Sequence, residues 1–193
     1  MGIAHRPNNL HWNYFLALDA DAAEISRFIE FSKANYKTYS LELARLLMAA
    51  AAEVDVIAKI ACLKVDTSSK AKNIGQYHAA LVSARPNLRK YPIEIKRFGL
   101  SLKPWSTWTS AMAPLWWTAC NKTKHQRNTH FKEANLKNAL NAVAGLHVML
   151  LYAFPDEATH GALLPRPQLF SVPESHITGY GPVEDASEIE YLL

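Results

Sequence analysis

The chain has 193 residues, of which 49% are hydrophobic and 20% charged, and it contains 2 cysteines. This length fits one folded domain with a substantial core, and the composition excludes a wholly disordered chain, a disulfide scaffold and a cysteine-rich zinc site. Residues 1–150 carry 20 basic and 10 acidic side chains, whereas residues 151–193 carry 1 basic and 7 acidic ones. The basic body indicates a polyanionic partner, and two merely solvated surfaces are the alternative.

The N-terminal segment has no signal-peptide pattern, because residues 1–15 lack both a basic run and a long apolar stretch. The most apolar segments, residues 46–52 and 142–154, are interrupted by polar side chains. They fall short of the ~20 apolar residues that a membrane span needs. We therefore expect a cytoplasmic protein without a membrane contact, in which Cys62 and Cys120 are free thiols.

Helical spacing of apolar residues predicts three main helices and one short helix in the first half of the chain. The first covers residues 20–33, with a short helix over residues 10–18 before it. Ser40 caps a long helix over residues 41–65, in which apolar residues recur at alternating steps of four and three. The third is predicted over about residues 70–84.

Residues 85–113 interrupt the helical pattern with three prolines. Two short alternating runs, residues 93–95 and 100–102, predict a small hairpin or an extended insertion. Trp105 and Trp108 are expected to pin this insertion to the body of the protein.

Helical spacing resumes after Pro114, and a last long helix is predicted from Phe131 to Ala153. The fold class is therefore all-α, an up-and-down bundle of four to five helices in residues 1–158. An extended acidic C-terminal arm follows in residues 159–193, and part of it is expected to pack on the helices or on a neighbouring subunit. Its acidic residues from 184 to 190 are predicted to shield the basic surface.

The densest polar chemistry of the chain follows a pair of tryptophans in the fourth predicted helix. Helical geometry puts Trp117, Asn121 and Lys124 in one row, with His125 four residues after Asn121. Together with Arg127, these groups suit the binding of a phosphate and the transfer of a proton near neutral pH. A structural role for His125 near the tryptophans is the alternative.

Three further polar residues are expected to support this site. Asp55 pairs with Lys59 four residues later. Glu53 lies in an apolar sector of the long helix, so it needs either a cation from residues 122–130 or access to water. His130 falls at a predicted helix break, where capping or surface exposure is the alternative.

Asn135, Asn138 and Asn141 recur at steps of three along the last predicted helix, which helix propensity disfavours. They either line a polar groove or act as buried amides that fix the helix register. His147, on the apolar face of the same helix, is interpreted as a core histidine.

The sequence predicts neither a metal nor a cofactor. His125 and His130 are five residues apart rather than three or four, and no nearby carboxylate completes a ligand set. Cys120 lacks an orienting triad, and the chain has no glycine-rich phosphate loop.

Three motifs and an Asn-rich helix carry a family resemblance. Ser-x-Glu-x-Ala and Glu-x-Asp (residues 40–44 and 53–55) precede WW-x-x-x-N-x-x-KH-x-R (residues 116–127) and an Asn-rich amphipathic helix. This pattern is similar to that of bacterial HEPN-like proteins over about residues 10–155. The resemblance implies an all-α bundle, often a homodimer. Many members are metal-independent endoribonucleases of toxin–antitoxin or phage-defence systems, which implies RNA and an antitoxin or regulatory protein as partners.

The family's Arg-polar-x-x-x-His motif is broken in this chain. Asn121 matches the polar position and His125 the histidine, but Cys120 occupies the position of the arginine. Either Arg127 or Lys124 supplies the missing cation, or the site binds without cleaving.

Three functions remain open. In a ribonuclease, His125 is the general acid or base, Arg127 and Lys124 stabilise the phosphate, Asn121 orients it, and Glu53 fixes one of the cations. In a catalytically degenerate dimeric module, the same segment binds RNA, a nucleotide or a protein partner. In the third, residues 122–132 are purely structural.

Overall fold

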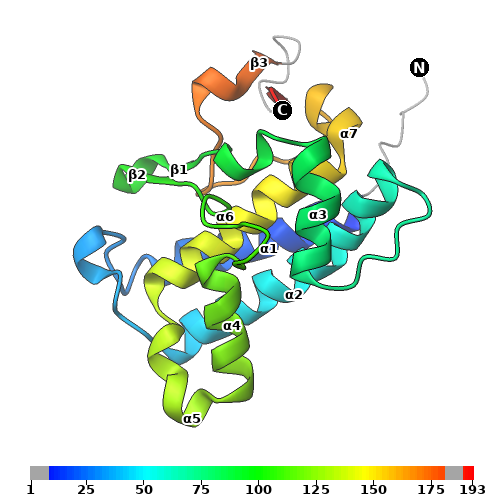
Figure 1. Cartoon of the computed structure of the whole chain (residues 1–193). Helices are drawn as coiled ribbons and strands as arrows, with labels where there is room; N and C mark the ends of the chain where they lie inside the picture. Colours follow the sequence, from blue (N-terminus) through cyan, green and yellow to red (C-terminus); the bar gives the residue numbers. More distant parts are fainter. Residues whose placement is uncertain (1–8, 181–188) are drawn as a thin grey trace.

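The computed structural model describes residues 9–180 and 189–193 (Figure 1). Within these ranges the α-helices are α1 (Leu10–Ile25), α2 (Leu41–Val65), α3 (Ile74–Ala84), α4 (Leu115–His125), α5 (Arg127–His130), α6 (Leu136–Ala153) and α7 (Pro155–Thr159). Two antiparallel hairpins pair β1 (Ile93–Ile95) with β2 (Leu100–Leu102) and β3 (Ile177–Tyr180) with β4 (Ile189–Tyr191). The predicted all-α fold with a small hairpin insertion is confirmed. No helix in the described ranges has both the length and the apolar character that crossing a bilayer requires.

Helices α2 and α6 form the centre of the core. α2 contacts α1, α3, α4 and α6, and every residue of α6 from Ala142 to Ala153 is buried. The Ser40 side chain accepts a hydrogen bond from the backbone N–H of Leu43 at 3.1 Å, so it caps α2 at the predicted position. Figure 1 shows α6 running through the middle of the bundle, with α1 and α2 beside it.

The prediction for the first helices was partly wrong. Residues 10–18 are helical as predicted, but they continue without a break to Ile25 in one helix, α1. The Asn9 side chain caps its start by accepting a hydrogen bond from Trp12 N–H at 3.0 Å. It ends before Ser26, so residues 26–33 do not continue it. Phe28, which lies within the predicted first helix, is 80% exposed.

Two other helices begin later than predicted, and each begins at an asparagine cap. Asn73 accepts from Gln76 N–H at 3.1 Å, so α3 begins at Ile74 rather than near residue 70. Asn135 accepts from Asn138 N–H at 3.1 Å, so α6 begins at Leu136 rather than at Phe131. Between α4 and α6 the chain forms the short α5 and a 3-10 turn, η4 (Phe131–Glu133).

Tryptophans anchor the hairpin insertion to α6, as predicted. Trp105 and Trp108 are fully buried. The Trp105 indole N–H donates to the Gly145 carbonyl oxygen at 3.0 Å, and the Trp116 indole N–H donates to the Pro104 carbonyl oxygen at 2.9 Å. A side chain on Gly145 would lie 2.9 Å from the Trp116 ring, so the glycine is what lets this ring approach α6.

The C-terminal arm is tied to α1 by a buried carboxylate. Asp19 is 1% exposed and accepts hydrogen bonds from the backbone N–H groups of Gln168, Leu169 and Phe170, with shortest distances of 2.7, 3.2 and 2.8 Å. Burial raises the pKa of Asp19 above its ordinary value, although the three N–H groups oppose that shift. The prediction that part of the arm packs on the helices is confirmed by its buried residues, Leu163, Leu169, Phe170 and Tyr191. The acidic residues that are predicted to shield the basic surface belong largely to residues 184–188, which lie outside the described residues.

Candidate functional site

Helix α4 carries the predicted site and separates two concave surfaces. It packs against α2 and α6 through Trp116, Ala119, Cys120 and Thr123, which are buried at steps of three and four. The side chains on either flank of that buried stripe line separate cavities. One faces α2, and the other faces the first turns of α6.

The α2–α4 pocket has a volume of about 510 Å³. Helix α2 contributes Met48, Ala51, Ala52 and Asp55, and helix α4 contributes Trp117, Cys120, Asn121 and Lys124. Four of the predicted site residues, Asp55, Trp117, Asn121 and Lys124, therefore line one cavity. The row that helical spacing predicted on α4 forms its wall.

Asp55 is held in place at the edge of this pocket. Its Oδ1 accepts a hydrogen bond from the Tyr77 hydroxyl at 2.8 Å, and its Oδ2 accepts one from the Lys59 ammonium group. Burial raises the pKa of Tyr77 well above its ordinary value, so the phenol stays protonated and remains a donor. The predicted Asp55–Lys59 pair is present, and Tyr77 of α3 is a second hydrogen-bond partner of Asp55.

Cys120, which the HEPN-like resemblance aligns with the arginine of the motif, is a neutral thiol. It is 7% exposed, and burial raises its pKa, although the nearby Lys124 ammonium group partly opposes that shift. A protonated, buried thiol packs as a small apolar group. Cys120 thus forms part of the apolar lining of the pocket.

The remaining predicted residues of the segment lie away from the pocket lining. His125 is the last residue of α4 and is exposed, Arg127 is exposed on α5, and His130 is partly exposed at the end of α5. Within the described part of the chain, none of these three side chains has a hydrogen bond or an ion pair. The structure therefore brings Asn121 and Lys124 together without His125 and Arg127.

The expectation that a cation of residues 122–130 pairs with Glu53 was wrong. Glu53 is partly exposed, as the alternative of access to water required, and its partner is His11 of α1, whose Nδ1 lies 2.6 Å from Glu53 Oε1. The His11 ring also stacks on Phe154 at a centroid distance of 6.0 Å. Sequence spacing gave no signal of this pair, because its members lie 42 residues apart on different helices.

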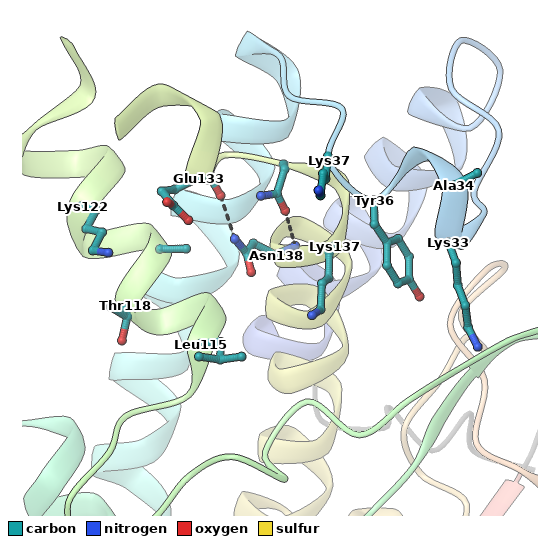
Figure 2. Close-up of a pocket in the computed structure, with 12 residues that line it drawn as sticks. Lys33, Ala34, Tyr36, Lys37, Leu115, Thr118, Lys122, Glu133, Lys137 and Asn138 are labelled. Atoms are coloured by element: carbon teal, nitrogen blue, oxygen red, sulfur yellow. Dashed lines mark hydrogen bonds between the residues drawn. The ribbon is translucent and has the colours of Figure 1, made fainter. Parts of the chain in front are cut away.

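On the other flank of α4 lies a longer depression, which we call the lysine groove. Two cavities of about 660 and 390 Å³ share Lys33, Tyr36, Leu115, Lys137 and Asn138, so they form one continuous groove. Five lysines line it: Lys33, Lys37, Lys103, Lys122 and Lys137. Figure 2 shows the wider part, with lysines from the 3-10 turn η1 (Lys33–Asn35) and its flank, from α4 and from α6 around Asn138.

Backbone contacts bring the lysines of distant segments together. The N–H of Leu136 donates to the Thr38 carbonyl oxygen at 2.8 Å, and the N–H of Lys137 donates to the Tyr36 carbonyl oxygen at 3.2 Å. Two otherwise orphaned donors of the first turn of α6 are satisfied in this way. The segment that carries Lys37 is thereby fixed beside Lys137.

The groove is rich in unpaired positive charge. All five lysines are exposed, and within the described residues none of their ammonium groups has a hydrogen bond or an ion pair. By contrast, Lys59 and Lys96 are each paired with a carboxylate. The groove lining contains a single carboxylate, that of Glu133.

Asn135, Asn138 and Asn141 lie along this groove, as one of the two interpretations of these asparagines predicted. Asn135 and Asn138 line the wider part, and Asn138 and Asn141 line the narrower part. The Asn138 amide donates to the Glu133 carbonyl oxygen at 2.9 Å, as the dashed line in Figure 2 marks. Its side-chain oxygen is left as an acceptor toward the groove. Sequence reasoning missed the lysines, since Lys33 and Lys37 are about a hundred residues from Lys137 in the chain.

Across the described ranges, no group of three or more histidine, cysteine, aspartate or glutamate side chains is arranged to hold a metal ion. Comparison of the chain with protein-family models, with curated proteins and with solved structures gives no match.

Proposed function

We propose that this protein binds RNA and that the phosphate backbone of a single strand lies in the lysine groove. The observation that carries the proposal is the set of five unpaired ammonium groups around one continuous groove. A surface of this kind releases condensed counterions when phosphates replace them, which supplies most of the sequence-independent affinity for nucleic acid.

The uncharged lining of the groove favours a single strand over a duplex. The ring of Tyr36 offers a surface on which a base can stack, and Thr118 and Asn138 offer hydrogen bonds to sugars or phosphates. Stacking on a protein side chain requires unpaired bases, as single strands provide. RNA binding without cleavage corresponds to the catalytically degenerate binding module. That module remained possible because the arginine motif is broken, and here we place it on a HEPN-like scaffold.

A metal-independent endoribonuclease of a toxin or phage-defence system is the second candidate. It is favoured by the exposure of His125 one helical turn from Lys122, which lines the groove. A strand in the groove would pass this end of α4, where His125 would act as general acid or base and Arg127 would stabilise the phosphate. The cytoplasmic location, the homodimer and the antitoxin or regulatory partner belong to this proposal, and sedimentation velocity of the purified chain tests the dimer.

One experiment separates the two candidates. Wild type, His125→Ala and the double variant Lys122→Gln/Lys137→Gln are incubated with a mixed RNA in EDTA, and both cleavage and binding are measured. The binding module predicts intact RNA in every sample and weaker binding only in the double variant. Cleavage by wild type that is lost in His125→Ala would establish the ribonuclease, and unchanged binding by the double variant would refute the groove as the site.

A matched control for the double variant is Lys70→Gln/Lys72→Gln. Lys70 and Lys72 are exposed in the connection between α2 and α3 and do not line the groove. This variant has the same net charge as the groove variant. A difference between the two therefore reports the position of the charge and not its amount.

A further inference from the structure

The α2–α4 pocket lies on the opposite flank of α4 from the lysine groove and has a different chemistry. Its floor is apolar, with Met48, Ala51 and the neutral thiol of Cys120, and the Trp117 ring forms one side. Its polar groups are few and lie at the edge: one carboxylate, one amide and one ammonium group. A volume of about 510 Å³ with this lining is typical of a pocket for a small planar ligand.

Trp117 is a rigid platform. Its ring packs against that of Trp116 at a centroid distance of 5.8 Å and an interplanar angle of 73°. Trp116 is in turn held by its hydrogen bond to the Pro104 carbonyl oxygen and by an edge contact with Trp105 at 5.2 Å. Because its neighbours are buried and fixed, Trp117 offers a ligand an aromatic face at little entropic cost.

Asp55 determines which planar ligand fits. Each of its carboxylate oxygens already accepts one hydrogen bond, from Tyr77 or from Lys59, so each retains one acceptor position. Two neighbouring acceptors that are fixed in one plane match a ligand with two adjacent N–H donors. Among the nucleobases, guanine presents such a pair, its N1–H and its exocyclic amino group.

The other two polar groups complete a nucleotide site. The Asn121 amide can donate to the guanine carbonyl oxygen, and the Lys124 ammonium group, one turn further along α4, is placed for the phosphate. Lys124 has no carboxylate partner within the described residues, so it is free to bind an anion.

We propose that the α2–α4 pocket binds a guanine nucleotide, with the base on Trp117 and its two N–H donors on Asp55. The inference rests on the proposed function only where the guanine belongs to the same RNA strand that occupies the lysine groove. A free guanine nucleotide has the same chemistry, and the test distinguishes the two sources.

The test uses the full chain and isothermal titration with GMP, IMP and AMP. IMP lacks the exocyclic amino group, so it loses one hydrogen bond to a charged acceptor and should bind at least about tenfold more weakly than GMP. AMP lacks both donors of the pair and should bind more weakly still. Equal affinity for the three nucleotides, or no binding of any, would overturn the proposal.

Variants check the assigned roles. Asp55→Asn can still accept from Tyr77 but has lost an acceptor oxygen, so the preference for GMP over IMP should disappear. Ala52→Phe fills the pocket from an exposed helix position, so it should abolish binding while the helix content and the urea midpoint stay unchanged. Asp156→Asn changes an exposed acid of α7 and serves as the control of equal charge. Unaltered GMP binding in Ala52→Phe would show that the nucleotide lies elsewhere.

Binding measurements with short RNA strands identify the source of the guanine and test the two proposals independently. If a strand with one guanine binds more tightly than an all-uridine strand, and Asp55→Asn removes the difference, the guanine comes from RNA. If GMP binds but the guanine adds nothing to the strand, the ligand is a free nucleotide. If the lysines control binding of both strands while GMP does not bind, the pocket proposal fails and the RNA proposal stands.

Discussion

The salt dependence of RNA binding tests the lysine groove quantitatively. The perturbation is the double variant Lys122→Gln/Lys137→Gln, which removes two of the five ammonium groups, one from α4 and one from α6. An all-uridine strand is the appropriate ligand, because it has no guanine to occupy the α2–α4 pocket. Binding is followed by fluorescence anisotropy of the labelled strand.

The magnitude follows from the number of lysines. If each ammonium group neutralises one phosphate of a single strand, the slope of log affinity against log salt is about −0.7 for each contact, or about −3.5 for five. Between 50 and 200 mM salt, wild-type affinity should then fall about 130-fold. With three lysines left the slope becomes about −2.1, and the fall shrinks to about 18-fold.

The control Lys70→Gln/Lys72→Gln has the same net charge and should retain the wild-type slope. A double variant whose slope equals that of wild type would refute the reasoning, because its missing lysines would then not contact phosphates. A wild-type affinity that does not depend on salt would refute the polyanion ligand itself.

Three predictions concern stability, and each is checked by urea unfolding. Asp19→Ala leaves three N–H groups of the arm without their acceptor, two of them on the buried residues Leu169 and Phe170. The free energy of unfolding should therefore fall by about 2–4 kcal/mol, a net value that includes the gain from no longer burying the Asp19 carboxylate. His147 is fully buried, which lowers its pKa from 6.5 to about 3. The unfolded chain therefore binds the extra proton below pH 6.5, and about 2 kcal/mol of stability should be lost from pH 7 to pH 5. Gly145→Ala places a Cβ 2.9 Å from the Trp116 ring and should cost about 1–3 kcal/mol through overpacking.

Each of these has its own control. Asp156→Ala removes an exposed acid and should leave the urea midpoint unchanged. His147→Phe should flatten the loss of stability between pH 7 and pH 5, and an unchanged loss would assign it to other groups. Gly75→Ala, at an exposed position in the first turn of α3 whose nearest neighbour would be 3.5 Å away, should stabilise the protein by less than about 1 kcal/mol, the value for a helix interior. If Gly145→Ala stabilised equally, the close approach of Trp116 to α6 would not be tight.

Local signals in the sequence were sufficient for α2 and for the hairpin insertion. Ser40 caps the first, and an uninterrupted apolar seam runs from that cap to its end. The alternating runs of the hairpin match its strands residue for residue. In both segments the local preference and the tertiary contacts favour the same structure.

The helix boundaries that were wrong share a cause. Asn73 and Asn135 cap α3 and α6, but each lies near other residues that are equally good caps by type. Which asparagine caps a helix depends on where the helix meets its neighbours, as Phe28 shows: its spacing is helical, and its side chain is exposed. Residue type and spacing alone do not contain that information.

Residue spacing also decided which parts of the candidate site could be predicted. The row of Trp117, Asn121 and Lys124 belongs to one helix, so its geometry followed from spacing. The lysine groove joins side chains of η1, α4, α6 and the insertion, and the partner of Glu53 comes from α1. Such groups meet only in the folded chain, so the sequence did not predict them.

The carboxylate of Asp19 also has a consequence for biosynthesis. Its N–H donors lie 149 to 151 residues later in the chain. At about 5–20 residues per second, a ribosome needs roughly 8–30 s to add them after Asp19. During that interval α1 can dock on α2 only while the Asp19 carboxylate is still hydrated. The surface that residues 168–170 later cover therefore stays exposed to water.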